Sequence, residues 1–333
     1  MKLKHILTVV IILIIAMGLY RISSSLSVTQ NATYKEITIP ENSSTEEIAS
    51  ILYKNSIIKS KTYFLFEEKI LHKDKKIQSG DFVIPEHISL SELSNILARY
   101  GKDANIVKIT IPEGYSNEQI SQLLNKNNLT AGKDFLSKVQ NWTGDNYWFL
   151  NGIPQNSHKL DGFLFPSTYF FDKNESSNQI INTMLDQFNI EISPYKSYIV
   201  QNNYNPRNLI TIASLIEKEA QKDVDRPKIS SVIYNRLNKG MPLQIDATIL
   251  YVIGHKNTLY NKDLTVKSPY NTYINKGLPP SPICNPGIKS IKAAIYPDKT
   301  DYLYYVLDKQ TDQHVFASTY KEHLANIKKY LNN

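Results

Sequence analysis

The stretch LITIASLIEKEA, residues 209–220, places two glutamates two positions apart in a segment whose other side chains suit a protein core. Because an α-helix advances about 100° per residue, the apolar side chains of this stretch gather on one side, which predicts a helix with a buried stripe. We expect Thr211, Ser214 and Lys218 on the opposite side, toward water. The predicted stripe consists of Leu209, Ile212, Ala213, Ile216 and Ala220.

The two glutamates differ in their expected surroundings. Glu219 falls beside Ile212, close to the stripe, whereas Glu217 lies further from its centre. Burial against apolar groups disfavours the charged form of a carboxyl and raises its pKa, and a neutral carboxyl can donate a proton to a leaving oxygen. Glu219 is therefore the candidate acid. An alternative stays open, in which either glutamate forms an ordinary ion pair with Arg226 or Arg236.

Three segments nearer the N-terminus share one pattern. PENSSTEEIASIL begins at Pro40, PEHISLSELSNIL at Pro85 and PEGYSNEQISQLL at Pro112, and a short β-rich stretch precedes each proline. In each segment a serine and the Glu or Gln three residues later can form a capping box, in which the two side chains satisfy free backbone amides at a helix start. We predict small α+β modules over about residues 30–130. The boxes pair Ser44 with Glu47, Ser89 with Glu92, and Ser116 with Gln119.

The first 26 residues indicate export. Lys2 and Lys4 precede a run from Ile6 to Tyr20 that contains no acidic or basic residue, and Arg21 follows. A positive start and an apolar core are typical of a signal peptide or a membrane anchor. No convincing Ala-x-Ala cleavage site follows the run, which favours an uncleaved anchor over a cleaved signal peptide.

The remainder of the chain predicts a mixed α+β domain. The aromatic stretch LDGFLFPSTYFF, residues 160–171, is expected to form either a packed corner of the core or a wall of a ligand site. Residues 193–208 are predicted to be a connection. We expect a second helix over residues 226–237, a strand pair over residues 302–307 and 314–318, and a last helix from about Tyr320.

Composition excludes several classes of function. The net charge of +7 comes from lysines spread along the chain without an arginine-rich block, so nucleic acid is not the expected partner. Cys284 is the only cysteine, which rules out an intrachain disulfide. The seven histidines are scattered without paired helical spacing, so no metal site is predicted.

The chain contains ASLIEKEA at residues 213–220, SPYNTY at 268–273 and GLPPSPICNPG at 277–287, among other motifs. In order and spacing these motifs resemble those of the endolytic murein transglycosylase family, also called the YceG-like family. The resemblance covers roughly residues 105–330, and two loop positions depart from it: Ala247 replaces a common proline and Ser281 a common glycine. It implies a membrane anchor over residues 1–26, LysM-like α+β modules over 27–130 and a catalytic α+β domain over 131–333. The motifs are DGFLFPSTY, ASLIEKEA, NRLNKGMPLQIDAT, SPYNTY, GLPPSPICNPG, AAIYPDKTDYLYYV and HVFASTYKEH.

The resemblance implies a lyase that cuts peptidoglycan glycan strands internally. It would be held in the inner membrane by one span, with its catalytic body on the periplasmic side. Glu219 matches the family's catalytic acid, and Glu217 is left with a supporting role in local hydrogen bonding or packing. One carboxyl suffices in such an enzyme, because the 6-hydroxyl of N-acetylmuramic acid acts as the nucleophile and closes a 1,6-anhydro ring. We expect neither a metal nor an organic cofactor, and wall-synthesis proteins are further candidate partners.

Six loop residues are candidates for holding the sugars. Their amides and hydroxyls can pair with hydroxyl and N-acetyl groups, and tyrosine faces can stack on pyranose rings. For each of them, a hydrogen bond that stabilises its own loop is an equally open role. Asp246 also competes for the role of a second catalytic carboxylate. The candidates are Gln244, Asp246, Tyr270, Asn271, Thr272 and Tyr273.

Two other functions fit the same sequence. A membrane-anchored scaffold without activity could bind glycan through the modules, but it would need no protonatable glutamate on the core side of a helix. A hydrolase of the lysozyme type would keep the acid but would release a reducing-end sugar in place of an anhydro sugar.

Overall fold

The chain folds into two compact units, which divide between Ile106 and Val107. The predicted anchor over residues 1–26 lies outside the described residues, and within the described part no helix is long and apolar enough to cross a membrane. The assignment of functions to residues 27–130 and 131–333 stays a prediction. The computed structural model describes residues 34–70, 77–85, 90–99, 106–144, 147–156, 158–254, 256 and 258–331.

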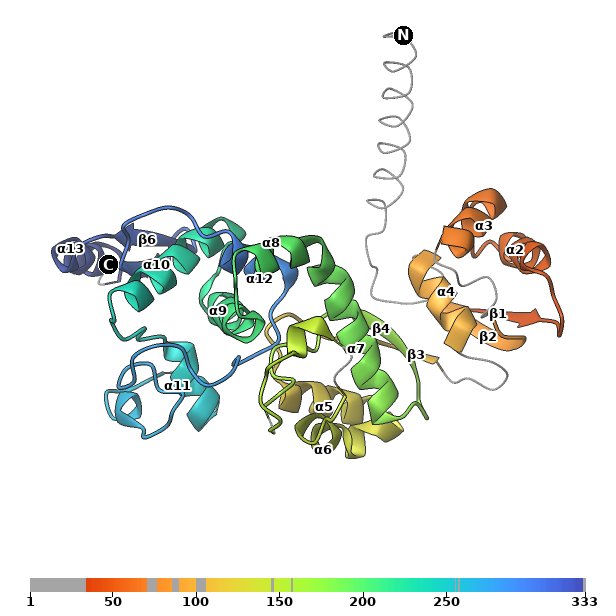
Figure 1. The fold of residues 1–333 in the computed structure, drawn as a ribbon, viewed down its shortest axis with the longest axis horizontal. Helices are drawn as coiled ribbons and strands as arrows, with labels where there is room; N and C mark the ends of the chain where they lie inside the picture. The colour runs from red at the N-terminus through yellow and green to blue at the C-terminus, as the bar shows by residue number, and fades with distance from the viewer. Residues whose placement is uncertain are drawn as a thin grey trace, which may run out of the picture. The chain divides into compact units, whose positions relative to one another are not determined.

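The N-terminal unit contains a two-stranded antiparallel sheet (Figure 1). Its register places Ile37 of the first strand opposite Phe82 of the second. Because side chains alternate along a strand, Ile37 and Ile39 are buried while Glu36 and Thr38 face outward. The elements are β1 (Tyr34–Ile39), α2 (Thr45–Lys54), α3 (Lys61–Ile70), β2 (Gly80–Pro85) and α4 (Leu90–Arg99).

Two of the three predicted capping boxes are confirmed. Ser44 and Glu47 exchange both bonds at the start of α2, at 3.2 Å from the Glu47 amide and 2.7 Å from the Ser44 amide. Ser116 and Gln119 do the same at 3.3 and 2.9 Å. The third predicted box cannot be compared, because Ser89 lies outside the described residues.

The third strand–helix segment belongs to the C-terminal unit. β3 (Ile106–Thr110) pairs with β4 (Thr168–Asp172), whereas β1 and β2 pair with each other. The hydroxyls of Thr110 and Thr168 lie 2.9 Å apart across this pairing. The three segments therefore share a local structure without sharing a sheet, since a capping box fixes only the helix start.

Helix α9 (Pro206–Glu219) is the centre of the C-terminal unit. The side chain of Asn205 accepts a hydrogen bond from the Asn208 amide at 3.1 Å, and Pro206 occupies the first turn, where no amide is needed. All eight residues from Leu209 to Ile216 are buried. Figure 1 shows α9 among the helices that pack on it. These are α10 (Arg226–Asn238), α11 (Asp246–Ile253) and α12 (Ile288–Ile295).

Two residues that we predicted on the solvent-facing side of α9 are buried, so the prediction is wrong for them. Thr211 and Ser214 are 2% and 0% exposed, although Lys218 is exposed as expected. The loop that carries Ile283 covers this face, and its amide donates to Ser214 Oγ at 3.1 Å. Ser214 Oγ in turn donates to the Thr211 carbonyl at 2.7 Å. Small hydroxyl residues can be buried when their hydrogen bonds are satisfied in this way, so the part of α9 from Leu209 to Ile216 is buried all round.

The predicted connection over residues 193–208 is also wrong. It contains α8 (Lys196–Gln201) and the first turn of α9, and Ile199 is buried. Residues 160–171 form a corner of the core, one of the two predicted roles, where Phe163 packs on Phe149 and Phe188 with ring centroids 5.6 and 5.2 Å apart. In the C-terminal unit, the α-helices before α8 are α5 (Asn117–Lys126), α6 (Phe135–Gln140) and α7 (Ser177–Ile192).

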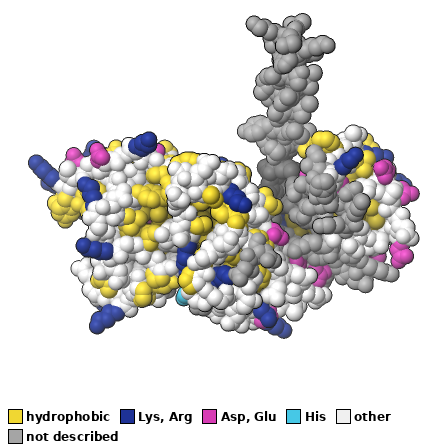
Figure 2. Space-filling view, in the orientation of Figure 1, with side chains coloured by type: hydrophobic (Ala, Val, Ile, Leu, Met, Phe, Trp, Pro, Cys, Tyr) yellow, Lys and Arg dark blue, Asp and Glu magenta, His cyan; other side chains and the backbone are white. Residues whose placement is uncertain are grey.

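The chain closes with the predicted strand pair and helix. β5 (Tyr304–Asp308) and β6 (Gln313–Ala317) form an antiparallel hairpin that places Tyr305 opposite Phe316, and α13 (Tyr320–Tyr330) follows. Figure 2 shows the basic side chains on the visible face as separate points, so the positive charge of the described residues is dispersed there.

Replacing Ser116 with Ala should lower the free energy of unfolding of the C-terminal unit by about 1 kcal/mol, because the Gln119 amide loses its acceptor. Urea denaturation followed by circular dichroism measures the change. Ser116→Thr keeps a capping hydroxyl and serves as the control. Equal stability of the Ala and Thr variants would show that this box contributes nothing.

Candidate active site

Glu219 is the last residue of α9, and its side chain is partly buried. The hydroxyl of Tyr305, on strand β5, donates a hydrogen bond to Glu219 Oε2 at 2.9 Å. The helix delivers the carboxyl to the edge of the core, and the C-terminal hairpin supplies its partner from 86 residues further along the chain.

The surroundings of Glu219 favour its neutral form. Burial raises the pKa of Glu219 from 4.5 to about 7; the Tyr305 hydrogen bond opposes this rise, and the negative charge of Asp246 adds to it. The carboxyl also lies at a helix C-terminus, where the partial charge of the helix is negative and disfavours an anion. Near neutral pH Glu219 can therefore both donate and accept a proton, which is what an acid–base catalyst needs.

Asp246 and Tyr273 lie within electrostatic range of Glu219. Asp246 is the exposed first residue of α11, and the Tyr273 hydroxyl donates a hydrogen bond to its Oδ1 atom. Burial, that hydrogen bond and the nearby charge of Asp246 raise the pKa of Tyr273, so Tyr273 stays a neutral donor. The structure thus brings together three sequence-predicted residues, Glu219, Asp246 and Tyr273.

Arg236 fixes the segment that carries Gln244. Its guanidinium donates to the carbonyls of Leu303 at 2.6 Å and Leu243 at 2.8 Å, and to Gln244 Oε1 at 3.2 Å. Gln244 is exposed and has a φ of 55°, a left-handed conformation that is uncommon for a residue with a side chain. Such conformations concentrate at functional sites. The Gln244 side-chain NH₂ has no hydrogen-bond partner among the described residues, so it can donate a hydrogen bond to a ligand.

Asn271 and Thr272 stabilise their own loop. Both are buried, at 0% and 2% exposure. The Asn271 amide group donates to the carbonyls of Leu264 and Val266 at 2.9 and 2.8 Å, and Thr272 Oγ1 accepts from the Ile245 amide at 2.9 Å. Of the two roles left open by the sequence, the structure favours loop stabilisation for this pair.

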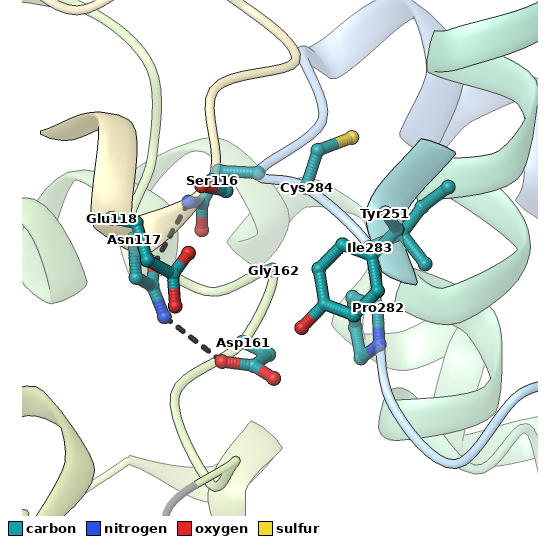
Figure 3. A pocket seen from close by; sticks show the side chains of 10 residues that line it. Ser116, Asn117, Glu118, Asp161, Gly162, Tyr251, Pro282, Ile283 and Cys284 are labelled. Carbon is teal, nitrogen blue, oxygen red and sulfur yellow. Dashed lines mark hydrogen bonds between the residues drawn. The ribbon is translucent and has the colours of Figure 1, made fainter. Parts of the chain in front are cut away.

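Tyr270 belongs to a different hydrogen-bond network. Its hydroxyl lies 2.6 Å from Ser281 Oγ, which donates to Asp161 Oδ2 at 2.8 Å, so Tyr270 is the donor to Ser281. Figure 3 shows Asp161 and Tyr251 lining a small hollow, with Asn117 hydrogen-bonded to Asp161 at 2.9 Å. Ser281 is thus the link that joins Tyr270 to this network.

Glu217 forms the ion pair that the sequence left open. Its Oε1 atom lies 3.3 Å from Arg226 Nη1, and its Oε2 atom accepts the Gly287 amide at 3.0 Å. The side chains of Glu217 and Arg226 are only 7% and 11% exposed. The pKa of neighbouring Glu113 is raised by burial and by the negative charge of Glu217. Glu217 therefore has a basic partner, whereas the hydrogen-bond partner of Glu219 is a tyrosine.

The sequence did not single out Tyr305 or the residues that support it. Tyr305 was predicted only as part of a strand, and nothing in YLYYVL distinguishes it from its tyrosine neighbours. His314 and Asp225 are 5% and 4% exposed and lie 3.0 Å apart, and the His314 ring packs edge-on against Tyr305. Within the described ranges, no three His, Cys, Asp or Glu residues gather in a way that could hold a metal ion.

Known proteins resemble this chain in sequence and in fold. The profile of the YceG-like family matches residues 37–329. The chain belongs to the YceG-like family. A crystal structure of a YceG-like protein from Listeria monocytogenes is 32% identical with a TM-score of 0.57, and the match covers 89% of this chain and 99% of that chain.

Two curated relatives carry the name endolytic murein transglycosylase. The protein from Bacillus subtilis (strain 168) is 39% identical over 90% of this chain and 85% of its own length. The protein from Streptococcus pneumoniae serotype 2 is 33% identical over 94% of this chain and 61% of its own length. In this YceG-like chain, the motifs ASLIEKEA, LQIDAT and SPYNTY supply the Glu219, Asp246 and Tyr273 side chains that meet at the site.

Glu219→Gln should stabilise the folded protein at pH 8 and leave it unchanged at pH 4. With its pKa raised, wild-type Glu219 keeps its proton when folded but loses it near pH 4.5 when unfolded, so stability falls as pH rises from about 4.5 to about 7. Glutamine removes this loss, which is on the order of 1 kcal/mol after allowance for solvent contact. Thermal unfolding at both pH values measures it.

Glu217→Gln is the matched comparison. It leaves Arg226 without its buried partner and should lower the free energy of unfolding by about 1–3 kcal/mol at pH 8. The two neutralising changes, two residues apart, are thus expected to have opposite signs. A Glu219→Gln protein less stable than wild type at pH 8 would contradict the raised pKa.

Proposed function

We propose that this chain is an endolytic murein transglycosylase in which Glu219 is the catalytic acid and then the base. The observation that carries the proposal is the position of Glu219, a carboxyl with a pKa of about 7 at the exposed end of a buried helix. Membership of the YceG-like family and the names of its curated relatives support the same activity.

The proposed reaction needs one carboxyl and no added water. Neutral Glu219 gives its proton to the glycosidic oxygen, the bond from that oxygen to C1 of N-acetylmuramic acid breaks, and N-acetylglucosamine leaves with a hydroxyl. The Glu219 carboxylate then takes the proton of the muramyl 6-hydroxyl while O6 bonds to C1. A 1,6-anhydro ring results, and Glu219 ends with its proton restored. Each proton transfer contributes about 10²–10⁴-fold.

Gln244, Tyr273 and Asp246 are the proposed sugar contacts of the site that contains Glu219. The free NH₂ group of Gln244 can donate to an N-acetyl carbonyl, and the exposed Asp246 carboxylate can accept from sugar hydroxyls. Tyr270 would contact a sugar further along the strand through its ring face, since its hydroxyl is hydrogen-bonded to Ser281. Asn271 and Thr272 would act by holding the loop that carries Tyr273.

The proposal includes the cellular setting. Residues 1–26 would anchor the protein in the inner membrane and place the catalytic unit on the periplasmic side, where nascent glycan strands are its substrate. The LysM-like modules would bind glycan, and wall-synthesis proteins would be its neighbours. A scaffold without activity is the rival; it would need no protonatable glutamate such as Glu219, and it would release no products.

Glu219→Gln should make anhydro-muramyl products undetectable in digests of purified peptidoglycan, because both proton transfers are lost. Mass spectrometry of the products gives the answer. Asp246→Asn is the control for a second catalytic carboxylate and should retain measurable cleavage. If Glu219→Gln forms anhydro products at a near wild-type rate, Glu219 is not the acid; reducing-end sugars from the wild type would indicate a hydrolase, and no products at all a scaffold.

The value of kcat/KM for wild-type cleavage should fall about tenfold per pH unit above about pH 7. Glu219 must carry a proton when the free enzyme meets its substrate, and with a pKa of about 7 it loses that proton as pH rises. Initial rates on isolated glycan strands between pH 5 and 9 (about two units either side of that pKa) test this. A rate that stays constant through pH 9 would exclude Glu219 as the proton donor.

A further inference from the structure

We infer that Tyr305 is a positioning residue that holds Glu219 Oε2, so that proton transfer to and from the substrate passes through Oε1 alone. This inference rests on the proposed function and adds which atom of Glu219 acts. It also makes the C-terminal hairpin, which lies far from α9 in the sequence, a part of the catalytic apparatus.

The two oxygens of Glu219 have different surroundings. Oε2 accepts the Tyr305 hydroxyl at 2.9 Å, and a phenol can donate only its single proton. Oε1 has no hydrogen-bond partner among the described residues, and it is not one of the buried atoms left without a partner, so solvent reaches it. When Glu219 is neutral, its proton is therefore placed on Oε1, since Oε2 is already occupied as an acceptor.

Tyr305 remains a donor throughout the reaction. Burial and the negative charge of Glu219 both raise its pKa well above 10. Its hydrogen bond is present in both protonation states of Glu219 and is stronger to the carboxylate, because bonds to ionised acceptors are shorter and stronger. Tyr305 thus stabilises the carboxylate after the first proton transfer, and it keeps Oε1 oriented toward the substrate for the second.

The hairpin holds the Tyr305 ring in place. The ring of His314 meets it edge-on, with centroids 5.3 Å apart and planes at 88°, and Phe316 packs 6.0 Å away. His314 is fixed by Asp225, whose Oδ2 atom accepts the His314 amide at 2.8 Å and lies 3.0 Å from Nδ1. Asp225 precedes α10, so this helix and the hairpin together determine where the Tyr305 hydroxyl points.

The charged groups around the pair decide how the pH profile responds. Asp246, from α11, faces Glu219 and disfavours its charge; Tyr305, from β5, favours it. Arg236, from α10, acts on Tyr305 and Tyr273. Removal of the Tyr305 hydroxyl takes away the group that stabilises the carboxylate, so the pKa of Glu219 should rise.

Tyr305→Phe in the full-length protein is the test, with isolated peptidoglycan glycan strands as substrate. The pH at which kcat/KM falls should move upward, and kcat should drop about ten- to a hundredfold, because the carboxyl is free to turn. Tyr302→Phe removes a hydroxyl from the approach to the same hairpin but keeps the ring contact with Phe316, so both values should stay at wild type. A fall in kcat with an unmoved pH profile would mean a merely structural role and would overturn the inference.

A second variant covers the case in which Tyr305→Phe does not fold. Fluorinated tyrosine at position 305 keeps the ring and the hydroxyl but makes the hydroxyl a stronger donor, so the pH profile should shift downward, opposite to Tyr305→Phe. An unshifted profile would overturn the inference. The result for Glu219→Gln separates the two claims: an active Glu219→Gln protein overturns the proposed function, whereas an inactive one with unshifted Tyr305 variants overturns only the role of Tyr305.

Discussion

Helix α9 is buried over all eight residues from Leu209 to Ile216, and its last residue is Glu219. A carboxyl that must hold a proton near neutral pH has to be removed from water, yet a substrate must be able to reach it. The end of a buried helix satisfies both demands, because the core desolvates one side of the carboxyl while the chain leaves the core on the other. Helices α10, α11 and α12 cover this helix, and the C-terminal hairpin reaches its last residue through Tyr305.

The partners of Glu219 come from separate parts of the chain. Tyr305 donates from β5 and Asp246 supplies a nearby negative charge from the start of α11. Arg236 ties these parts together, since one guanidinium donates to Leu303 next to β5 and to Leu243 before α11. A buried guanidinium is stable only with such partners, so the fold and the geometry of the site are fixed by the same hydrogen bonds.

In the C-terminal unit, most of the buried polar side chains discussed above stabilise the fold, and Glu219 is the one that can exchange a proton with a ligand. Asn271, Thr272 and Ser214 are almost wholly inaccessible. Asn271 holds its own loop together, Thr272 ties that loop to Ile245 before α11, and Ser214 holds the Ile283 loop against α9. Glu217 belongs to the same class, because its carboxylate is paired with Arg226 and accepts a hydrogen bond from the Gly287 amide. Glu219 differs from them in keeping one oxygen open, which is the feature expected of a group that exchanges protons with a ligand.

The sequence by itself determined the local features. Spacing of apolar residues predicted α9, and the Ser116–Gln119 pair predicted a helix start, because these signals act within a few residues. The spacing did not show that the Glu217 side chain is only 7% exposed, because its partners, Arg226 and the Gly287 amide, lie outside the helix. Only the tertiary structure decided the rest. It buried Thr211 and Ser214, it paired β3 with β4, and it chose Tyr305 among several tyrosines as the partner of Glu219. These outcomes depend on which distant segments pack together, and a helical or strand period carries no information about that.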